Sequence, residues 1–378
     1  TGKAGTRGPR ALPTCSTPYS NGRAGPHLTI LMENPSVDTA KLLPSRKTIV
    51  RGIQAFIVFS AAGTLLGLWW KRPAGLDTVL ANLDLRFILL LIPLIGLDYW
   101  LGGLRYRLFL NGKHFPNVSL LNCMRSNWAN MFMGAATPFQ SGGGPAQMYV
   151  LWKKGVRVAD SLLLSTVNLS ATMVFFMFSS AVALLWISPY FFGEDFMPAF
   201  RTWFISIGSF ASLILLFLLF PKGAFVVLEK LAGWIPLRSE GARAKRARIV
   251  AKAEAEIQRF GEGFRSILKF NKTGLFLTII ATLVLFSNKY LMGYAVARAM
   301  GQEVPFTLFI GLQVVQLLLV YFAPTPGASG VAELSSIWLM GKLMPESMLL
   351  VYAVLWRFFT TILAAIIGGF VLLREVEE

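Results

Sequence analysis

The chain has 378 residues, of which 54% are hydrophobic and only 15% are charged, and its net charge is +17. This composition exceeds what a soluble core requires and is typical of a membrane protein with several spans. Two cysteines and two histidines provide neither a disulfide framework nor metal-ligand spacing, and no Gly-rich segment continues into the Lys-Ser or Lys-Thr of a phosphate-binding loop. We expect no metal, no cofactor and no nucleic-acid partner, because the basic residues lie between apolar segments.

The first part of the chain differs from the rest. Residues 1–31 are rich in Gly, Pro, Ser, Thr and Arg without apolar periodicity, which predicts a disordered leader or an extension upstream of a start at Met32. Residues 32–48 are then a cytoplasmic N-terminal tail.

Apolar runs of about 20 residues, long enough to cross the hydrocarbon core, recur along residues 49–373, which we predict to be one transmembrane domain with a short tail at 374–378. They predict six transmembrane helices, at 52–70, 87–104, 161–193, 202–221, 273–297 and 347–373.

Two other apolar stretches, 126–152 and 304–332, are longer than one span needs and too short for two. Each has Pro and Gly in its middle, which favours two half-helices that meet at an unwound turn inside the membrane, a re-entrant hairpin. The residues that break the helices are Pro138, Gly142, Gly143, Pro324, Pro326 and Gly327.

These stretches belong to an internal repeat with an offset of 186 residues. The matching pairs are Pro138 and Pro324, Gly144 and Gly330, Ala146 and Ala332, Gln147 and Glu333, Trp152 and Trp338, and Gly155 and Gly341. The first repeat covers about 86–187 and the second about 273–373.

The positive charges test this arrangement, because Lys and Arg accumulate on cytoplasmic loops. With six spans and two hairpins, most of them fall on the inner side, including those of the basic amphipathic segment 222–272. The first hairpin then enters from the cytoplasm and the second from the outer face, an inverted repeat that places a substrate site between them. The basic segment is expected to lie on the anionic inner leaflet, with partner docking or gating as the alternative.

The segments 137–155 and 324–333 resemble the flippase-like domain family, which includes the membrane portion of lysylphosphatidylglycerol synthase and relatives associated with polyprenyl-glycan and hopanoid handling. The likeness covers most of residues 49–373, and Arg105, Arg107 and Arg357 also match the family pattern. It implies lipid handling. The sequence departs from the pattern at 168–170, where relatives often carry an acidic-basic pair, and at Ala328, where Gly is usual. Aminoacyl-transferring members add a soluble catalytic domain, and this chain resembles the membrane half alone.

The helix breaks are the first candidate binding site. The half-helix N-termini near Gly144 and Gly330 can present amides to a lipid phosphate, and the alternative is a packing kink without ligand. Gln147 and Glu333 lie one turn further on; either caps its own helix, and both are candidate headgroup contacts. Glu333 is also a candidate proton or counter-ion site.

Three ionisable residues fall inside predicted spans: Asp98, Lys289 and Arg357. Each is costly in a membrane unless it is paired or hydrated. We predict that Lys289 and Arg357 contact an anionic headgroup and that Asp98 is their counter-ion. A static buried ion pair or snorkelling at span ends remains the alternative.

Four amides recur at i, i+3 spacing: Asn127, Asn130, Gln313 and Gln316. Hydrogen bonds between helices are the default interpretation, and a polar path for a headgroup is the alternative.

The sequence therefore predicts an all-α lipid translocase of the inner, cytoplasmic membrane, with both termini inside. Its substrate would be a lipid with a phosphate or glycosylated headgroup. We expect membrane lipids as partners and leave open a cytoplasmic lipid-modifying enzyme and a homo-oligomer. No catalytic cluster stands at 105–125 or 222–272, so we expect no enzyme. The alternatives are a membrane-bound transferase of the lysylphosphatidylglycerol synthase type and a non-transporting scaffold that recruits such an enzyme.

Overall fold

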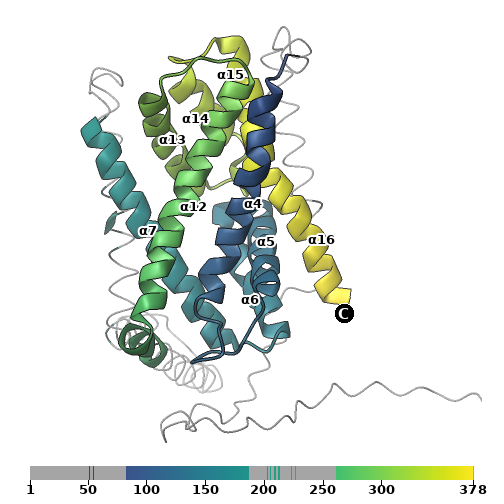
Figure 1. Ribbon diagram of the computed structural model, residues 1–378, viewed down its shortest axis with the longest axis vertical. Coiled ribbons are helices and arrows are strands. Elements are labelled where there is room, and N and C mark those ends of the chain that lie inside the picture. The colour runs from purple at the N-terminus through teal and green to yellow at the C-terminus, as the bar shows by residue number, and fades with distance from the viewer. Residues whose placement is uncertain are drawn as a thin grey trace, which may run out of the picture. The chain divides into compact units, whose positions relative to one another are not determined.

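The computed structural model describes residues 82–186 and 261–377 and a few scattered positions between 51 and 226. The regular elements in the two continuous ranges are helices (Figure 1). The leader 1–31, the tail 32–48, the predicted spans 52–70 and 202–221 and most of the basic segment 222–272 lie outside these ranges.

Long apolar helices occur at the four predicted spans that fall within the described ranges. They are α4 (Leu85–Arg107), α7 (Val158–Trp186), α12 (Lys272–Ala299), and α15 (Glu346–Arg357), which continues through a π-helical turn (Phe358–Ile362) into α16 (Leu363–Glu377). In the part of the chain that the structure describes, four helices are long and apolar enough to cross a membrane. The prediction of an all-helical membrane protein is confirmed. The predicted tail is corrected, because residues 374–377 continue α16.

Polar side chains determine where several of these helices begin and end. Asp84, Ser119 and Asn271 cap α4, α5 (Leu120–Ala136) and α12, and the side-chain oxygen of each accepts a backbone N–H from the first turn. Arg105 and Arg107 lie in the last turn of α4, where positive charge stabilises the helix dipole. Local sequence is therefore sufficient to place these ends.

Each of the two interrupted apolar stretches forms two short helices joined by a 3₁₀ turn. The elements are α5 (Leu120–Ala136), η3 (Pro138–Gln140) and α6 (Gly143–Lys153), and α13 (Phe306–Tyr321), η4 (Pro326–Ala328) and α14 (Val331–Met340). The helices of each pair pack against each other. The stretches extend further than predicted, because the first begins at residue 120 and the second ends at 340.

The order of elements repeats along the chain. Each half has a long helix, a helical hairpin and a second long helix, and α5 and α13 begin at Leu120 and Phe306, which are 186 residues apart. The predicted offset therefore matches the start of the first helix in each hairpin.

The first long helices of the two halves, α4 and α12, pack against each other and run in opposite directions. The backbone N–H of Asp84, just before α4, donates to the carbonyl of Ala299 at the end of α12 over 2.8 Å. Because α5 follows the end of α4 and α13 follows the end of α12, the two hairpins begin at opposite ends of this helix pair (Figure 1).

Small residues let the hairpins approach the long helices closely. A Cβ on Gly368 of α16 would lie 2.0 Å from the carbonyl oxygen of Trp128 on α5, and one on Gly293 of α12 would lie 2.6 Å from the Gln313 side chain on α13. Close backbone contact of this kind replaces the hydrophobic driving force that is missing between helices in lipid.

Candidate functional site

The two 3₁₀ turns have the same local structure. Residues 137–141 and 325–329 both begin with an extended Thr, continue with Pro at the first position of the turn, and then place a residue in the left-handed region, at φ 52° for Phe139 and 60° for Gly327. Within the turns the equivalent residues are thus 188 positions apart. Pro138 corresponds to Pro326, which corrects the sequence-based pairing with Pro324.

The same shift changes which glycines correspond. Gly142 and Gly330 are the residues that precede α6 and α14, whereas Gly144 lies inside α6. Gly330 has φ 84°, a conformation in which glycine carries no steric penalty. Gly143 has a packing role, since its Cβ position would lie 2.1 Å from the Asn130 side-chain oxygen. The Cβ position of Gly144 meets no atom within 4 Å, so its proposed contact with a phosphate stays a prediction.

The turns also hold unfavourable backbone conformations. The non-glycine residues with positive φ in the described ranges are Phe139, Gln140 and Ala328, at 52°, 54° and 57°, and all three belong to the two turns. The left-handed conformation costs an L-residue roughly 1–2 kcal/mol. Strain that is concentrated in this way is characteristic of ligand-binding and switch regions.

The two turns meet each other. A Cβ on Gly327 would lie 3.1 Å from the carbonyl oxygen of Ala135, at the end of α5. In the opposite direction, the Gln140 side chain donates to the carbonyl of Tyr321, the last residue of α13, over 3.3 Å. The ends of both hairpins therefore share one region, although the hairpins begin at opposite ends of the α4 and α12 pair.

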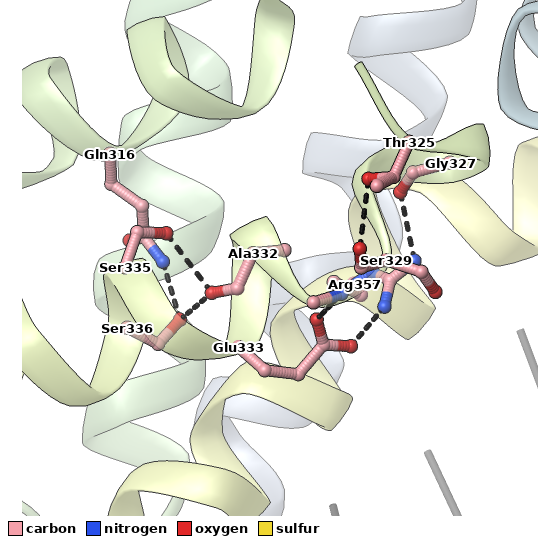
Figure 2. A network of polar contacts seen from close by, with 10 residues as sticks. Gln316, Thr325, Gly327, Ser329, Ala332, Glu333, Ser335, Ser336 and Arg357 are labelled. Atoms are coloured by element: carbon pink, nitrogen blue, oxygen red, sulfur yellow. Dashed lines mark hydrogen bonds and ion pairs between the residues drawn. The ribbon is translucent and has the colours of Figure 1, made fainter. Parts of the chain in front are cut away.

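A buried ion pair stands beside this contact (Figure 2). Arg357 Nη1 bonds to Glu333 Oε1, and Arg357 Nη2 donates to the carbonyl of Gly327 over 2.8 Å. The second carboxylate oxygen of Glu333 accepts the backbone N–H of Gly330 over 2.7 Å, which caps α14. Both charged residues are at most 6% exposed. The guanidinium thus links the second turn to α14.

The ion pair adjoins an irregular piece of helix. Arg357 is the last residue of α15, and the π-helical turn Phe358–Ile362 follows it directly. Single π-turns of this kind occur frequently at functional sites.

Three of the four predicted amides make hydrogen bonds between helices, as the default interpretation required, whereas Asn127 donates to Met131 Sδ within α5. Asn130 Nδ2 donates to Gln147 Oε1 over 2.8 Å, which joins α5 to α6. Gln313 Nε2 donates to Gln316 Oε1 over 2.7 Å and to the Tyr352 hydroxyl, which joins α13 to α15. Gln316 in turn donates to Ser336 of α14 (Figure 2).

Asp98 and Lys289 form a second ion pair, between α4 and α12, with Lys289 Nζ 2.8 Å and 3.0 Å from the two carboxylate oxygens. We expected Asp98 to serve as counter-ion for both Lys289 and Arg357. The structure corrects this, since the carboxylate on Arg357 is that of Glu333. Contact of these cations with a headgroup stays a prediction.

Two polar groups were missed by the sequence analysis. Arg105 was named as part of the family pattern and not as a candidate site residue, but it lies in α4 and donates to Asn168 and Thr172 of α7. A signal was present: Arg105 follows Asp98 by seven residues and so shares its helix face.

The second missed group is Glu375, which was assigned to the tail. It is 3% exposed, and its carboxylate lies 2.9 Å from Lys154 Nζ and 3.9 Å from Arg125 Nη1. Its backbone carbonyl accepts from Lys153. The last turn of α16 is therefore held against α5 and the end of α6 by three basic side chains.

Comparison with known proteins decides the family. Residues 54–368 match the family described as the lysylphosphatidylglycerol synthase TM region. The chain belongs to this family. Two members of the UPF0104 membrane protein group are similar to it. One, from Archaeoglobus fulgidus, is 25% identical over 284 residues, which cover 73% of this chain and 83% of the relative. The other, from Pyrococcus horikoshii, is 22% identical over 343 residues, which cover 84% and 96%. No solved structure matches.

Membership of the lysylphosphatidylglycerol synthase TM region family confirms the resemblance inferred from the two Pro/Gly segments. Within the described ranges, the structure contains no group of three or more His, Cys, Asp or Glu residues that could hold a metal ion. The polar groups of the site are instead ion pairs and amides located at the turns and between the long helices.

Proposed function

We propose that this protein is a lipid translocase, which moves a lipid with a phosphate or glycosylated headgroup across the membrane. The observation that carries the proposal is the contact between two strained turns from oppositely oriented hairpins, beside the buried Glu333–Arg357 pair. Irregular backbone at membrane depth is tolerated only where protein or a water-filled cavity shields it. A polar site of this kind between inverted repeats is the usual location of a transported ligand.

In the membrane, the short helices would form re-entrant hairpins. Helices α5 and α6 have 17 and 11 residues, and α13 and α14 have 16 and 10. At 1.5 Å per residue, each is shorter than the roughly 30 Å of hydrocarbon. We infer six spans in the cell inner membrane, both termini in the cytoplasm, and turns that meet near the midplane.

The headgroup would bind near the turns, where Arg357, Gly330 and Glu333 meet. Its phosphate would compete with the Glu333 carboxylate for the Arg357 guanidinium, since both anions suit the planar donors of Arg. Glu333 would then take a proton or remain on the Gly330 amide. The acyl chains stay in the bilayer while the headgroup passes. The energy source would be the gradient of the lipid itself or protons coupled through Glu333 or Asp98.

The test uses the full-length protein in liposomes that contain fluorescent lipids with phosphate or glycosylated headgroups. A membrane-impermeant reductant quenches only the outer leaflet, so a translocase makes the inner leaflet accessible faster than in protein-free liposomes. The Arg357→Ala variant, checked for folding, is expected to lose most of this acceleration. If the wild-type protein accelerates none of these lipids, the translocase proposal is wrong.

The same preparation addresses the alternatives. A membrane-bound transferase would modify the lipid headgroup without moving it, which mass spectrometry of the lipids detects. A scaffold would co-purify with a cytoplasmic enzyme, and this association would disappear when residues 243–265 are deleted.

A further inference from the structure

Arg105 differs from Lys289 and Arg357, the two cations predicted to contact a headgroup. Lys289 and Arg357 each face a carboxylate, whereas the hydrogen-bond partners of Arg105 within the described ranges are neutral. Its Nε donates to Asn168 Oδ1 over 3.3 Å. Its Nη2 donates to the Asn168 carbonyl over 2.8 Å and to Thr172 Oγ1 over 3.2 Å. Arg105 therefore brings a positive charge between α4 and α7 without a carboxylate partner of its own among the described residues.

The geometry leaves one side of this guanidinium available. A guanidinium is planar and has five N–H donors, of which Nε and Nη2 share one edge. That edge faces Asn168 and Thr172, and the two N–H groups of Nη1 have no acceptor among the described residues. The three bonds to α7 therefore fix the plane of the group and direct its opposite edge away from that helix.

A second set of donors in the same cluster also lacks an acceptor. Asn168 is 2% exposed, and its Oδ1 accepts from Arg105 while its Nδ2 has no hydrogen-bond partner. An amide nitrogen that is buried without an acceptor is unfavourable, because it loses its hydrogen bonds to water and gains none in return. Two neighbouring side chains thus present N–H donors and no acceptor, which is the pattern that an anion satisfies.

The nearby carboxylate makes no ion pair with Arg105. Asp98 lies on the same face of α4, seven residues earlier and so about 10 Å away along the axis, and both of its oxygens are already near Lys289 Nζ. Arg105 is only partly buried, but a cation without a carboxylate partner is costly within a membrane span, so an anionic ligand would be favoured there.

The cluster adjoins the contact between the turns. Thr172 and Phe176 follow Asn168 at successive intervals of four along α7, and the Phe176 ring lies 5.0 Å from the ring of Tyr321. Tyr321 is the residue whose carbonyl accepts from Gln140 of the first turn. The Arg105 cluster therefore lies two turns along α7 from a residue that packs against the end of α13, where the hairpins meet.

We propose that Arg105 and Asn168 form an oxyanion site, in which Nη1 of Arg105 and Nδ2 of Asn168 bind the oxygens of a phosphate group. The inference deepens the proposed function, on which it rests where the phosphate is that of a lipid. It adds Arg105 as a cation that binds the phosphate. Arg357 and Lys289, the cations considered before, are already paired with carboxylates. A lipid phosphate and free phosphate have the same chemistry, so the experiment separates them.

Binding to the purified full-length protein is measured by isothermal titration calorimetry with three probes. Dihexanoylphosphatidate represents a lipid phosphate, inorganic phosphate represents the free ion, and dihexanoylglycerol lacks the phosphate. We expect saturable binding of the phosphatidate and none of dihexanoylglycerol. Stronger binding of inorganic phosphate than of phosphatidate would keep the oxyanion site but overturn the lipid as its source.

Two variants and a matched control assign the site. Arg105→Gln removes the charge and is expected to weaken phosphatidate binding about tenfold or more, the loss of one charge-assisted hydrogen-bonding group. Asn168→Asp keeps the shape but provides Arg105 with its own carboxylate, so binding should be abolished while the unfolding temperature stays equal or rises. Arg107→Gln is the control, because Arg107 lies in the same turn and donates to Leu110 and Asn117 instead.

The outcomes separate this inference from the proposed function. Unchanged affinity in Asn168→Asp, or absence of saturable binding of either phosphate probe to the wild type, overturns the oxyanion site. In the liposome assay, loss of translocation in Asn168→Asp places the site on the lipid path, whereas translocation at the wild-type rate removes it from that path and leaves the translocase proposal intact. Phosphatidate binding without translocation by the wild type supports the site and contradicts the translocase.

Discussion

Glu333 joins three parts of the structure, because its carboxylate bonds to Arg357, caps α14 through the Gly330 amide, and through Arg357 reaches the Gly327 carbonyl. Capping alone would explain an acidic residue at this position, since carboxylates are favoured in the first turn of a helix. The buried guanidinium of Arg357 also needs this carboxylate as its counter-ion, because an unpaired charge at this depth is strongly unfavourable. The residue therefore has a structural role as well as a place in the proposed site.

We predict that Glu333→Gln destabilises the protein by about 3–5 kcal/mol, since Gln keeps the cap but leaves Arg357 as an uncompensated buried charge. The measurement is denaturant or thermal unfolding of the purified protein in detergent. The double variant with Arg357→Met removes both charges and should recover much of the loss. A single variant as stable as the wild type would contradict the ion pair.

Ala328 is an unusual residue for its conformation, since it is buried and has φ 57°. We predict that Ala328→Gly stabilises the protein by about 0.5–1 kcal/mol. Glycine removes the strain energy of the left-handed conformation in the folded state. This gain exceeds the stability that is lost because glycine raises the conformational entropy of the unfolded chain. Ala171→Gly is the matched control, because Ala171 lies in the middle of α7 and is buried to the same extent as Ala328, and it should destabilise by about 0.5–1 kcal/mol. Equal losses in both variants, measured by unfolding, would argue against strain at Ala328.

At the scale of elements, the last turn of α16 is fastened to the first hairpin by charge. Glu375 approaches Lys154 and Arg125 through its carboxylate, and its carbonyl accepts from Lys153. The contact unites the end of the second half with α5 and α6 of the first.

We predict that Glu375→Gln weakens this contact and lowers the free energy of unfolding by about 1–3 kcal/mol. The loss is smaller than for a fully buried ion pair, because the basic partners of Glu375 are partly exposed. Hydrogen exchange should rise in the last turn of α16 and at the end of α6, and remain unchanged in α13 and α14. Glu377→Gln, an exposed position in the same turn, should have little effect. Uniform exchange changes across the protein would indicate global destabilisation instead of a local fastening.

At the scale of the whole molecule, the two halves are related by opposite orientation. The antiparallel α4 and α12 pair places the α4–α5 loop and the α12–α13 loop at opposite ends. The membrane orientation that we propose follows from this geometry together with the excess of positive charge on the inner side.

Cysteine labelling tests that orientation. In a variant without the native cysteines, Lys113→Cys should resist a membrane-impermeant maleimide in intact spheroplasts and react after permeabilisation. Glu303→Cys should react in both conditions. Both positions are exposed, so accessibility to the reagent reports only the side of the membrane. Labelling of the two cysteines from the same side would exclude opposed hairpins.

Much of the architecture was predictable because its determinants are local. Apolar length predicts the long helices, and Pro and Gly within apolar sequence predict where a helix breaks. The repeat offset of 186 matches the first residues of α5 and α13. Inside the turns it becomes 188, because Phe322, Ala323 and Pro324 separate α13 from Thr325, whereas α5 is followed directly by Thr137. The offset is still 188 where α6 and α14 begin and is 187 where they end, because α14 is one residue shorter. A single constant offset cannot detect such a local shift.

The sequence by itself determined the membrane class, the four described long helices, the two interrupted ones and the ionisable residues inside them. Only the tertiary structure decided which charges pair, because a helix's rotation about its axis and its neighbours depend on packing across the whole bundle. Thus Arg357 faces Glu333, Asp98 faces Lys289, and Arg105 faces the neutral Asn168. The amino-acid composition does not distinguish these charges. Their electrostatic energies in the folded protein differ, because in a low-dielectric interior the energy of a charge depends on its nearest partner.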